Sequence, residues 1–234
     1  MHTELLFRDD AYLRLCEARV LSASELGIVL DRTVFYPMGG GQPGDTGVLR
    51  WSGGQVRIAD TRKGDEPDTV KHVPEPGSAL PQPGDLVTAE IDWDRRYAHM
   101  RIHTCLHVLS CVVVAPVTGG NIAADKGRLD FDIDMSQLDA ARIEAGVNEL
   151  IARAIPTETV WITDAELDAR PDLVKTMSVQ PPRGAGRVRL LRIEGVDLQP
   201  CGGTHVRNIA EIGRVRVLRI RSEGKRNKRV EIGF

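Results

Sequence analysis

The segment Arg101-Ile-His-Thr-Cys-Leu-His107 lies near the middle of a 234-residue chain, inside a stretch that we expect to form a helix from about residue 94 to residue 114. Pro116 and the Gly119-Gly120 pair are expected to end that helix. His103 and His107 share one face of it, with Cβ atoms about 5–6 Å apart, so their imidazoles can bind one zinc ion. Taken alone, a pair of this spacing is more often two core or surface histidines than two ligands.

A second cluster of ligand types follows much later, in Cys201-Gly-Gly-Thr-His205. The two glycines let the backbone turn tightly, so that the thiolate and the imidazole can face one point. Cys201 alone could simply be a buried, packed cysteine. Both clusters together give four of the best zinc ligands in two close pairs, and we predict one zinc ion per chain, bound by His103, His107, Cys201 and His205.

The remaining cysteines and histidines fit this site less well. Cys105 lies two residues from each histidine and points to another face of the helix, and Cys111 lies about two turns from His103, so both are expected to pack in the core. Cys16 has no partner in the sequence. His72 and His99 are more typical of surface or core histidines, although His99 shares the face of His103.

Short strand-like runs precede the helix, and glycine- and proline-rich turns separate them. Their spacing is typical of a small β-barrel over residues 1–92, with strands expected at 28–30, 33–36, 47–51, 55–58 and 86–91. The segment 5–15 is ambiguous. After the helix, a strand is expected at 128–133, followed by a second helix that Ser136 and Asp139 can cap. Its apolar stripe consists of Ile143, Val147, Leu150, Ile151 and Ala154.

After Pro156 the chain is again expected to form strands, and the last two of them are expected to form a hairpin that closes an antiparallel sheet. Val215 and Val217 alternate with arginines, the alternation slips at Leu218, and this slip would fit a bulge. A turn is expected at 224–227. The sequence therefore predicts an α+β protein, with a barrel domain at 1–92 and a zinc-binding α+β domain at 93–234.

Composition is that of an ordinary soluble globular protein, with 41% hydrophobic and 27% charged residues. No apolar window is long enough for a membrane helix, and the start has no secretion signal. Four cysteines give no obvious disulfide framework, so we expect a cytoplasmic protein with no membrane partner. We expect no dinucleotide cofactor.

Charge is unevenly distributed although the net charge is only −2. Residues 183–229 hold 13 Lys and Arg against four Asp and Glu. Such a run is usually a solvated face, and a nucleic-acid contact is the alternative interpretation.

Four segments carry a resemblance to a known family. They are 101–107, 201–206, the glycine-rich 35–47 and the basic 222–229, and together they resemble the editing domain of alanyl-tRNA synthetases and the freestanding alanyl-tRNA editing proteins of medium length, the AlaX group. The resemblance implies a translation-factor-like barrel followed by an editing domain, and hydrolysis of serine, and also glycine, wrongly esterified to tRNA(Ala). Cys105 departs from the family, where a small residue such as alanine is expected.

The resemblance also suggests roles for further residues. Gly40, Gly41 and Gln42 are expected to approach the substrate, with a tight barrel turn as the equal alternative. The basic residues Lys225, Arg226, Lys228 and Arg229 would contact tRNA phosphates. Asp197 and Thr204 lie close to the ligand loop and are candidates to orient a ligand, although capping or a turn is a more common use.

Editing chemistry is reasonable on energetic grounds, because a pocket for alanine rejects glycine and serine poorly and a second, hydrolytic site corrects the errors. Four protein ligands nevertheless give the closed geometry of structural zinc, so either one ligand, with His205 the candidate, is exchangeable or the coordination expands. Two other functions stay open: an RNA-binding module with structural zinc, and a zinc hydrolase of small esters or amides.

Overall fold

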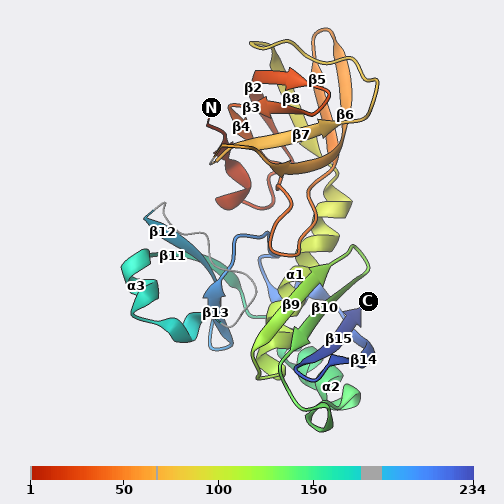
Figure 1. The fold of residues 1–234 in the computed structure, drawn as a ribbon, viewed down its shortest axis with the longest axis vertical. Helices are drawn as coiled ribbons and strands as arrows, with labels where there is room; N and C mark the ends of the chain where they lie inside the picture. The colour runs from red at the N-terminus through yellow and green to blue at the C-terminus, as the bar shows by residue number, and fades with distance from the viewer. Residues whose placement is uncertain (1, 67, 175–185) are drawn as a thin grey trace. The chain divides into compact units, whose positions relative to one another are not determined.

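A computed structural model describes residues 2–66, 68–174 and 186–234 (Figure 1). The chain divides into two compact units, residues 1–97 and 98–234. The division falls within helix α1 (Trp93–Val112), which begins directly after the boundary expected at residue 92. Within the described ranges, no helix has both the length and the apolar character that crossing a membrane requires.

The first unit contains a closed barrel in which each neighbouring pair of strands is antiparallel. The strands alternate inward apolar and outward polar residues, and the buried side chains of Ile28, Leu49 and Ile58 fill the interior. This confirms the predicted small β-barrel. In barrel order the strands are β2 (Leu15–Ser24), β3 (Gly27–Leu30), β7 (Val70–Pro74), β6 (Gly54–Lys63), β5 (Gly47–Trp51) and β8 (Leu86–Ile91).

The strand predicted at 33–36 is wrong beyond Thr33. Only β4 (Arg32–Thr33) is extended there, and it pairs in parallel with β1 (Glu4–Leu5) outside the barrel. The backbone N–H groups of the next residues are satisfied by side chains: Phe35 donates to Thr33 Oγ1 at 3.0 Å and Tyr36 donates to Asp45 at 2.6 Å. Phe35 packs in the barrel core and Tyr36 is also buried, although neither takes part in a sheet ladder.

The second unit is built on a four-stranded antiparallel sheet in the order β14-β15-β10-β9. Its strands are β9 (Val117–Ile122), β10 (Lys126–Phe131), β14 (Arg216–Gly224) and β15 (Asn227–Gly233). Helix α1 packs closely on one face, since a Cβ at Gly127 would stand 2.5 Å from Ile102 Cγ2. The register of β14 shifts between Val217 and Arg219, which confirms the predicted bulge.

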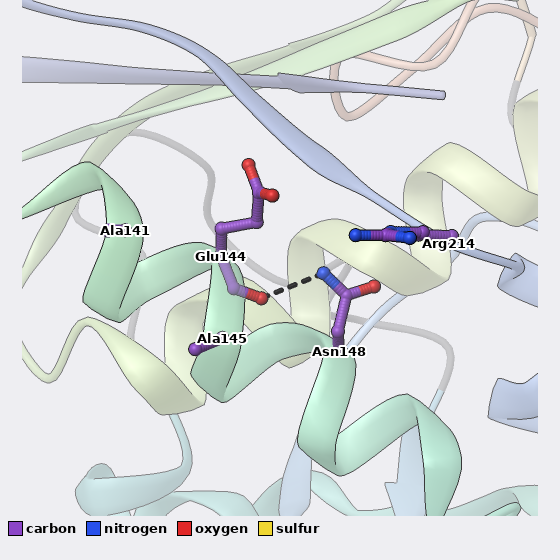
Figure 2. A pocket seen from close by; sticks show the side chains of 5 residues that line it. All are labelled: Ala141, Glu144, Ala145, Asn148 and Arg214. Atoms are coloured by element: carbon purple, nitrogen blue, oxygen red, sulfur yellow. Dashed lines mark hydrogen bonds between the residues drawn. The ribbon is translucent and has the colours of Figure 1, made fainter.

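Helix α2 (Ala140–Ala152) buries Ile143, Val147 and Ile151, as its periodicity predicts. Leu150 is only half-buried, and Ala154 is exposed and lies beyond the end of the helix. Asp139 caps its first turn, whereas Ser136 lies in a separate turn of 3₁₀ helix capped by Asp134. The polar side of α2 covers the free edge of β14: Asn148 bonds both main-chain groups of Val215, and Glu144 accepts from Val217 N–H at 2.9 Å. Figure 2 shows the small pocket at this edge, lined by Ala141, Glu144, Ala145, Asn148 and Arg214.

A three-stranded antiparallel sheet completes the second unit; the sequence predicts strands after Pro156 but neither the bounds nor the pairing of these three. It joins β11 (Thr157–Thr163), β12 (Arg187–Ile193) and β13 (Asp197–Pro200) in that order, with the short helix α3 (Asp164–Asp168) following β11. Strand β13 leads directly into the loop that contains Cys201 and His205. Arg183, at the start of the basic segment, lies outside the described residues.

Candidate metal centre

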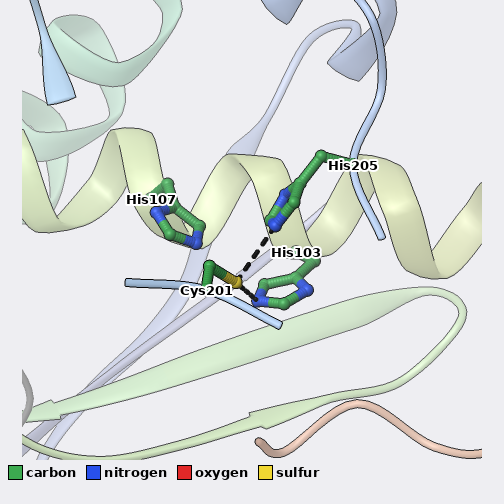
Figure 3. A group of neighbouring side chains, drawn as sticks. All are labelled: His103, His107, Cys201 and His205. Carbon is green, nitrogen blue, oxygen red and sulfur yellow. Dashed lines mark hydrogen bonds between the residues drawn. The ribbon is translucent and has the colours of Figure 1, made fainter. Parts of the chain in front are cut away.

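Helix α1 places His103 and His107 one turn apart, with ring centroids 5.4 Å from each other. The loop after β13 brings Cys201 Sγ within 3.5 Å of His103 Nε2 and within 3.1 Å of His205 Nε2. Figure 3 shows the three imidazoles and the thiol facing one point, and their four ligand atoms all lie within 4.8 Å of one another. Ligand atoms around tetrahedral zinc stand about 3.3–3.8 Å apart, so a small rearrangement would bring these four to zinc geometry.

Asp197 fixes the ring of His107. Its Oδ2 lies 2.9 Å from His107 Nδ1, so that nitrogen carries a proton and donates a hydrogen bond to the carboxylate. Burial lowers the pKa of this ring, but Cys201 and Asp197 raise it to about 9. Nε2 would therefore give up its proton to bind a metal, while Nδ1 stays bonded to the carboxylate, as is common among zinc-bound histidines. Gln199 in turn donates to Asp197 Oδ2 at 2.7 Å, and this contact holds the carboxylate in place.

Thr104 performs the same task for His205. Its hydroxyl donates to the carbonyl of Met100 at 2.8 Å, so its oxygen accepts a hydrogen bond from His205 Nδ1–H at 3.1 Å. This bond leaves His205 Nε2 unprotonated and turned toward Cys201. Burial lowers the pKa of His205 to about 3, which keeps the ring neutral at physiological pH.

The thiol of Cys201 is prepared to lose its proton. Burial alone would raise its pKa, but the adjacent His103, His205 and His107 together lower the pKa well below the ordinary value. A thiolate is the form that binds zinc.

Arg189 on β12 holds the ligand loop from its other side. Its Nη1 donates to the carbonyls of Cys201 and Gly203, both at 2.9 Å, and its Nη2 donates to Thr159 Oγ1 at 3.0 Å. Gly202 adopts no positive φ, and a Cβ there would meet nothing within 4 Å. Gly203, the second glycine of the expected tight turn, has no positive φ either, and hydrogen bonds from Arg189 hold the loop.

Among the other sequence candidates, Cys105 and Cys111 lie outside the cluster. Cys105 is fully buried, and burial raises the pKa of its thiol to about 12. Cys111 donates to the carbonyl of Val196 at 3.3 Å. Asp197 contacts a ligand as we expected for one of the two candidates, while Thr204 is completely buried in the loop and its role stays a prediction.

Sequence reasoning did not find Thr104, Gln199 or Arg189. Asp197 and Gln199 are two residues apart on β13, so they extend from the same face of the strand, and both are buried. That alternation of polar residues beside Cys201 was the one available signal. Thr104 contacts His205, about 100 residues further along the chain, and Arg189 contacts Cys201, 12 residues further along. Neither contact is visible in the sequence before the chain is folded.

The glycine-rich segment of the first unit forms a tight turn. Gly39 and Gln42 exchange two backbone hydrogen bonds of 3.0–3.1 Å, and Gly40 and Gly41 between them have φ of +58° and +83°, which favour glycine. Gln42 is fully buried. The turn expected as one alternative is thus present, and contact of Gly40, Gly41 and Gln42 with a substrate stays a prediction.

A buried ion pair supports that segment. Asp45 accepts from Arg96 Nε at 3.0 Å, and Arg96 also donates to the carbonyls of Ala11 and Val34. Both side chains are at most 1% exposed. Asp45 also accepts from Tyr36 N–H, so the pair fixes both ends of the glycine-rich segment within the first unit.

The four predicted RNA-contact residues lie at the turn between β14 and β15 or just after it. Arg226 forms an ion pair with Asp132, and Arg229 forms ion pairs with Asp130 and Glu223. Lys228 is only 7% exposed and donates to two backbone carbonyls of the turn. Lys225 is exposed, and no bond of its side chain occurs within the described residues.

Comparison with known proteins places both units among the modules of translation. Residues 11–95 match the family model described as tRNA synthetases class II (A), and residues 188–231 match the threonyl and alanyl tRNA synthetase second additional domain. Both matched families are therefore families of tRNA synthetase domains.

Individual relatives narrow this class. The alanyl-tRNA editing protein AlaX-M of Methanosarcina barkeri is 36% identical over 97% of both chains, and that of Saccharolobus solfataricus is 32% identical over the same shares. The alanine–tRNA ligase of Korarchaeum cryptofilum is 37% identical over 94% of this chain but only 25% of its own length. The chain belongs to the family of alanyl-tRNA editing proteins, as the resemblance implied.

Proposed function

We propose that this protein is a hydrolase that removes wrong amino acids from tRNA(Ala), cleaving the ester bond of seryl-tRNA(Ala) and of glycyl-tRNA(Ala). The observation that carries the proposal is the convergence of three imidazoles and one thiolate in a chain of the editing family. In this proposal residues 1–92 form the barrel domain, residues 93–234 form the editing domain, and the protein works in the cytoplasm.

The donor set fits one zinc ion. Asp197 and Thr104 contact the Nδ1 atoms of His107 and His205, so the Nε2 atom of each ring is the one available to a metal, and the neighbouring histidines lower the pKa of Cys201. His103, His107, Cys201 and His205 would hold the ion. When bound, zinc can polarise an ester carbonyl, activate water or orient the substrate.

Discrimination against correctly charged tRNA has a simple physical basis. A site that hydrogen-bonds the hydroxyl of serine leaves its own polar groups unpaired when alanine enters, at a cost of about 1–3 kcal/mol for each buried group. Alanyl-tRNA(Ala) would therefore bind poorly and escape hydrolysis.

The test is a deacylation assay with purified protein and matched substrates. Seryl-tRNA(Ala) should be hydrolysed and alanyl-tRNA(Ala) spared, and His103→Ala should abolish the activity while the protein stays folded by circular dichroism. His2→Ala removes an exposed histidine and is the matched control, which should retain full activity. Binding of tRNA without turnover would establish an RNA-binding module instead, and cleavage of small esters without any effect on seryl-tRNA would establish a general hydrolase.

A further inference from the structure

The sheet β9-β10-β14-β15 has two unlike faces. The register places Ile220 beside Val230 and Leu129, and this face is apolar and faces helix α1. Residues of the other face are charged, with three acidic side chains, Asp130, Glu223 and Glu231, against six basic ones. The six are Lys126, Arg128, Arg216, Arg219, Arg221 and Arg229.

Each acidic side chain on this face is already neutralised by a basic neighbour. Glu231 pairs with Lys126 at 3.1 Å. Asp130 forms ion pairs with Arg128 and Arg229, and hydrogen bonds from both arginines lower its pKa although burial opposes this. Glu223 pairs with Arg221 and Arg229. Two of the three excess positive charges on this face therefore belong to the remaining arginines.

Those remaining arginines are Arg216 and Arg219 on the edge strand β14. They stand opposite Gly233 and Glu231, which are two residues apart on β15, so the bulge at Leu218 leaves both arginines on the same face. Both are exposed, and neither has a carboxylate within 4 Å among the described residues. Asn148 and Glu144 bond the main chain at Val215 and Val217, so next to Arg216 it is the side chain that is offered to a partner.

The turn at 224–227 offers less free charge than its sequence suggests. Arg226, Lys228 and Arg229 are engaged within the protein, and they join the turn to β10 and close it on itself. Breaking these ion pairs and hydrogen bonds to bind a phosphate would offset part of the binding free energy that the phosphate contact provides. Exposed guanidinium groups without a partner incur no such cost, and they bind phosphate oxygens in a bidentate manner.

We propose that Arg216 and Arg219 form the docking surface for phosphates of the tRNA backbone, and that Arg226, Lys228 and Arg229 mainly stabilise the hairpin. This inference rests on the proposed function, because it names where that substrate is held. Contacts to phosphates position an RNA without reading its sequence, so the surface would bind tRNAs of different sequence alike.

The test is the equilibrium binding of fluorescently labelled, uncharged tRNA(Ala) by the whole protein at several KCl concentrations, which requires no hydrolysis. Arg216→Gln combined with Arg219→Gln should weaken binding roughly 10- to 100-fold at 0.1 M salt, and should reduce the slope of log Kd against log salt by about 1.5–2. Lysines at both positions should restore most of the slope, since they restore the charge. The kcat/KM for seryl-tRNA(Ala) should fall by the same factor as the affinity.

Two matched double variants make the result decisive. Arg142→Gln with Arg153→Gln removes the same charge from exposed positions on α2 and should leave the slope unchanged. Lys225→Gln with Arg226→Gln tests the turn. If that variant lowers the slope while the Arg216/Arg219 variant keeps it, the proposed surface is wrong. If the unaltered protein binds no tRNA at all, the proposed function fails as well, so the two failures can be told apart.

Discussion

At the scale of the residue, Asp197 is the side chain outside the four ligands whose removal should weaken zinc binding most. It orients His107 through a 2.9 Å contact and is itself buried. Asp197→Ala should lower zinc affinity about 10- to 100-fold, the range found when such supporting contacts are lost. Competition with a chromophoric chelator measures this, and an affinity equal to that of the unaltered protein would mean that His107 needs no support.

Arg189 should act on the same site through the loop. Arg189→Gln removes the hydrogen bonds to the carbonyls of Cys201 and Gly203, and we expect the free energy of unfolding to fall by about 1–3 kcal/mol. Arg189→Lys, which cannot span both carbonyls, should be intermediate. Urea denaturation with and without zinc measures both effects. If Arg189 holds the ligand loop, the loss of unfolding free energy should be larger when zinc is present. Equal losses with and without zinc would contradict that role.

At the scale of the element, His72 joins three parts of the barrel unit. Its Nδ1 donates to the carbonyl of Ile28 on β3 at 2.9 Å, and its Nε2 accepts from the hydroxyl of Thr33 at 2.7 Å. Burial lowers the pKa of this histidine from 6.5 to about 4, against the opposing effect of the bond to Ile28. The folded state therefore requires the neutral ring.

This shift gives the stability a defined pH dependence. The unfolded chain binds a proton at His72 below about pH 6.5 while the folded protein does not, so stability is complete above pH 6.5 and is lost as the pH falls toward 4. The loss should reach about 2–3 kcal/mol at pH 4.5. Urea midpoints measured from pH 7.5 to 4.5 should fall in the unaltered protein by the amount that corresponds to this loss of stability. His72→Gln should lack it, and an equal pH slope in the variant would contradict the assignment.

The elements that the sequence predicted correctly are those with a strong contrast between faces. Ile143, Val147 and Ile151 mark the buried side of α2, and the alternation from Val230 to Ile232 marks β15. Strand β2 was missed because Leu15 at its start is exposed while the small Ala18 is buried, so its two faces differ little in hydrophobicity. Strand β9 was missed because Gly119 and Gly120 indicate a break, although sheet pairing with β10 overrides that preference.

At the scale of the whole molecule, metal binding should be linked to the stability of the second unit. An ion that binds only the folded state adds about 2.7 kcal/mol when its concentration is 100 times its Kd. Removing zinc with a chelator should therefore lower the melting temperature by several degrees, and adding zinc back should restore it. The His103→Ala variant should melt at one temperature under both conditions. Melting unaffected by the chelator in the unaltered protein would argue against a tightly bound ion.

The candidate site was predictable to the extent that its chemistry was local. His103 and His107 were one helix turn apart in the sequence, and Cys201 and His205 were four residues apart, so only the meeting of the two pairs had to be inferred. The supporting residues were not local. Arg189 reaches the ligand loop because β12 pairs with β13. The sequence predicts strands in this part of the chain but not which of them pair.

The central claim is that four side chains from two distant segments share one zinc ion. X-ray absorption at the zinc edge of the purified protein tests it most directly. We predict one zinc per chain with one sulfur ligand at about 2.3 Å and three nitrogen ligands at about 2.0–2.1 Å, and loss of the sulfur shell in Cys201→Ser. A protein without zinc, or zinc surrounded by nitrogen and oxygen alone, would contradict the account.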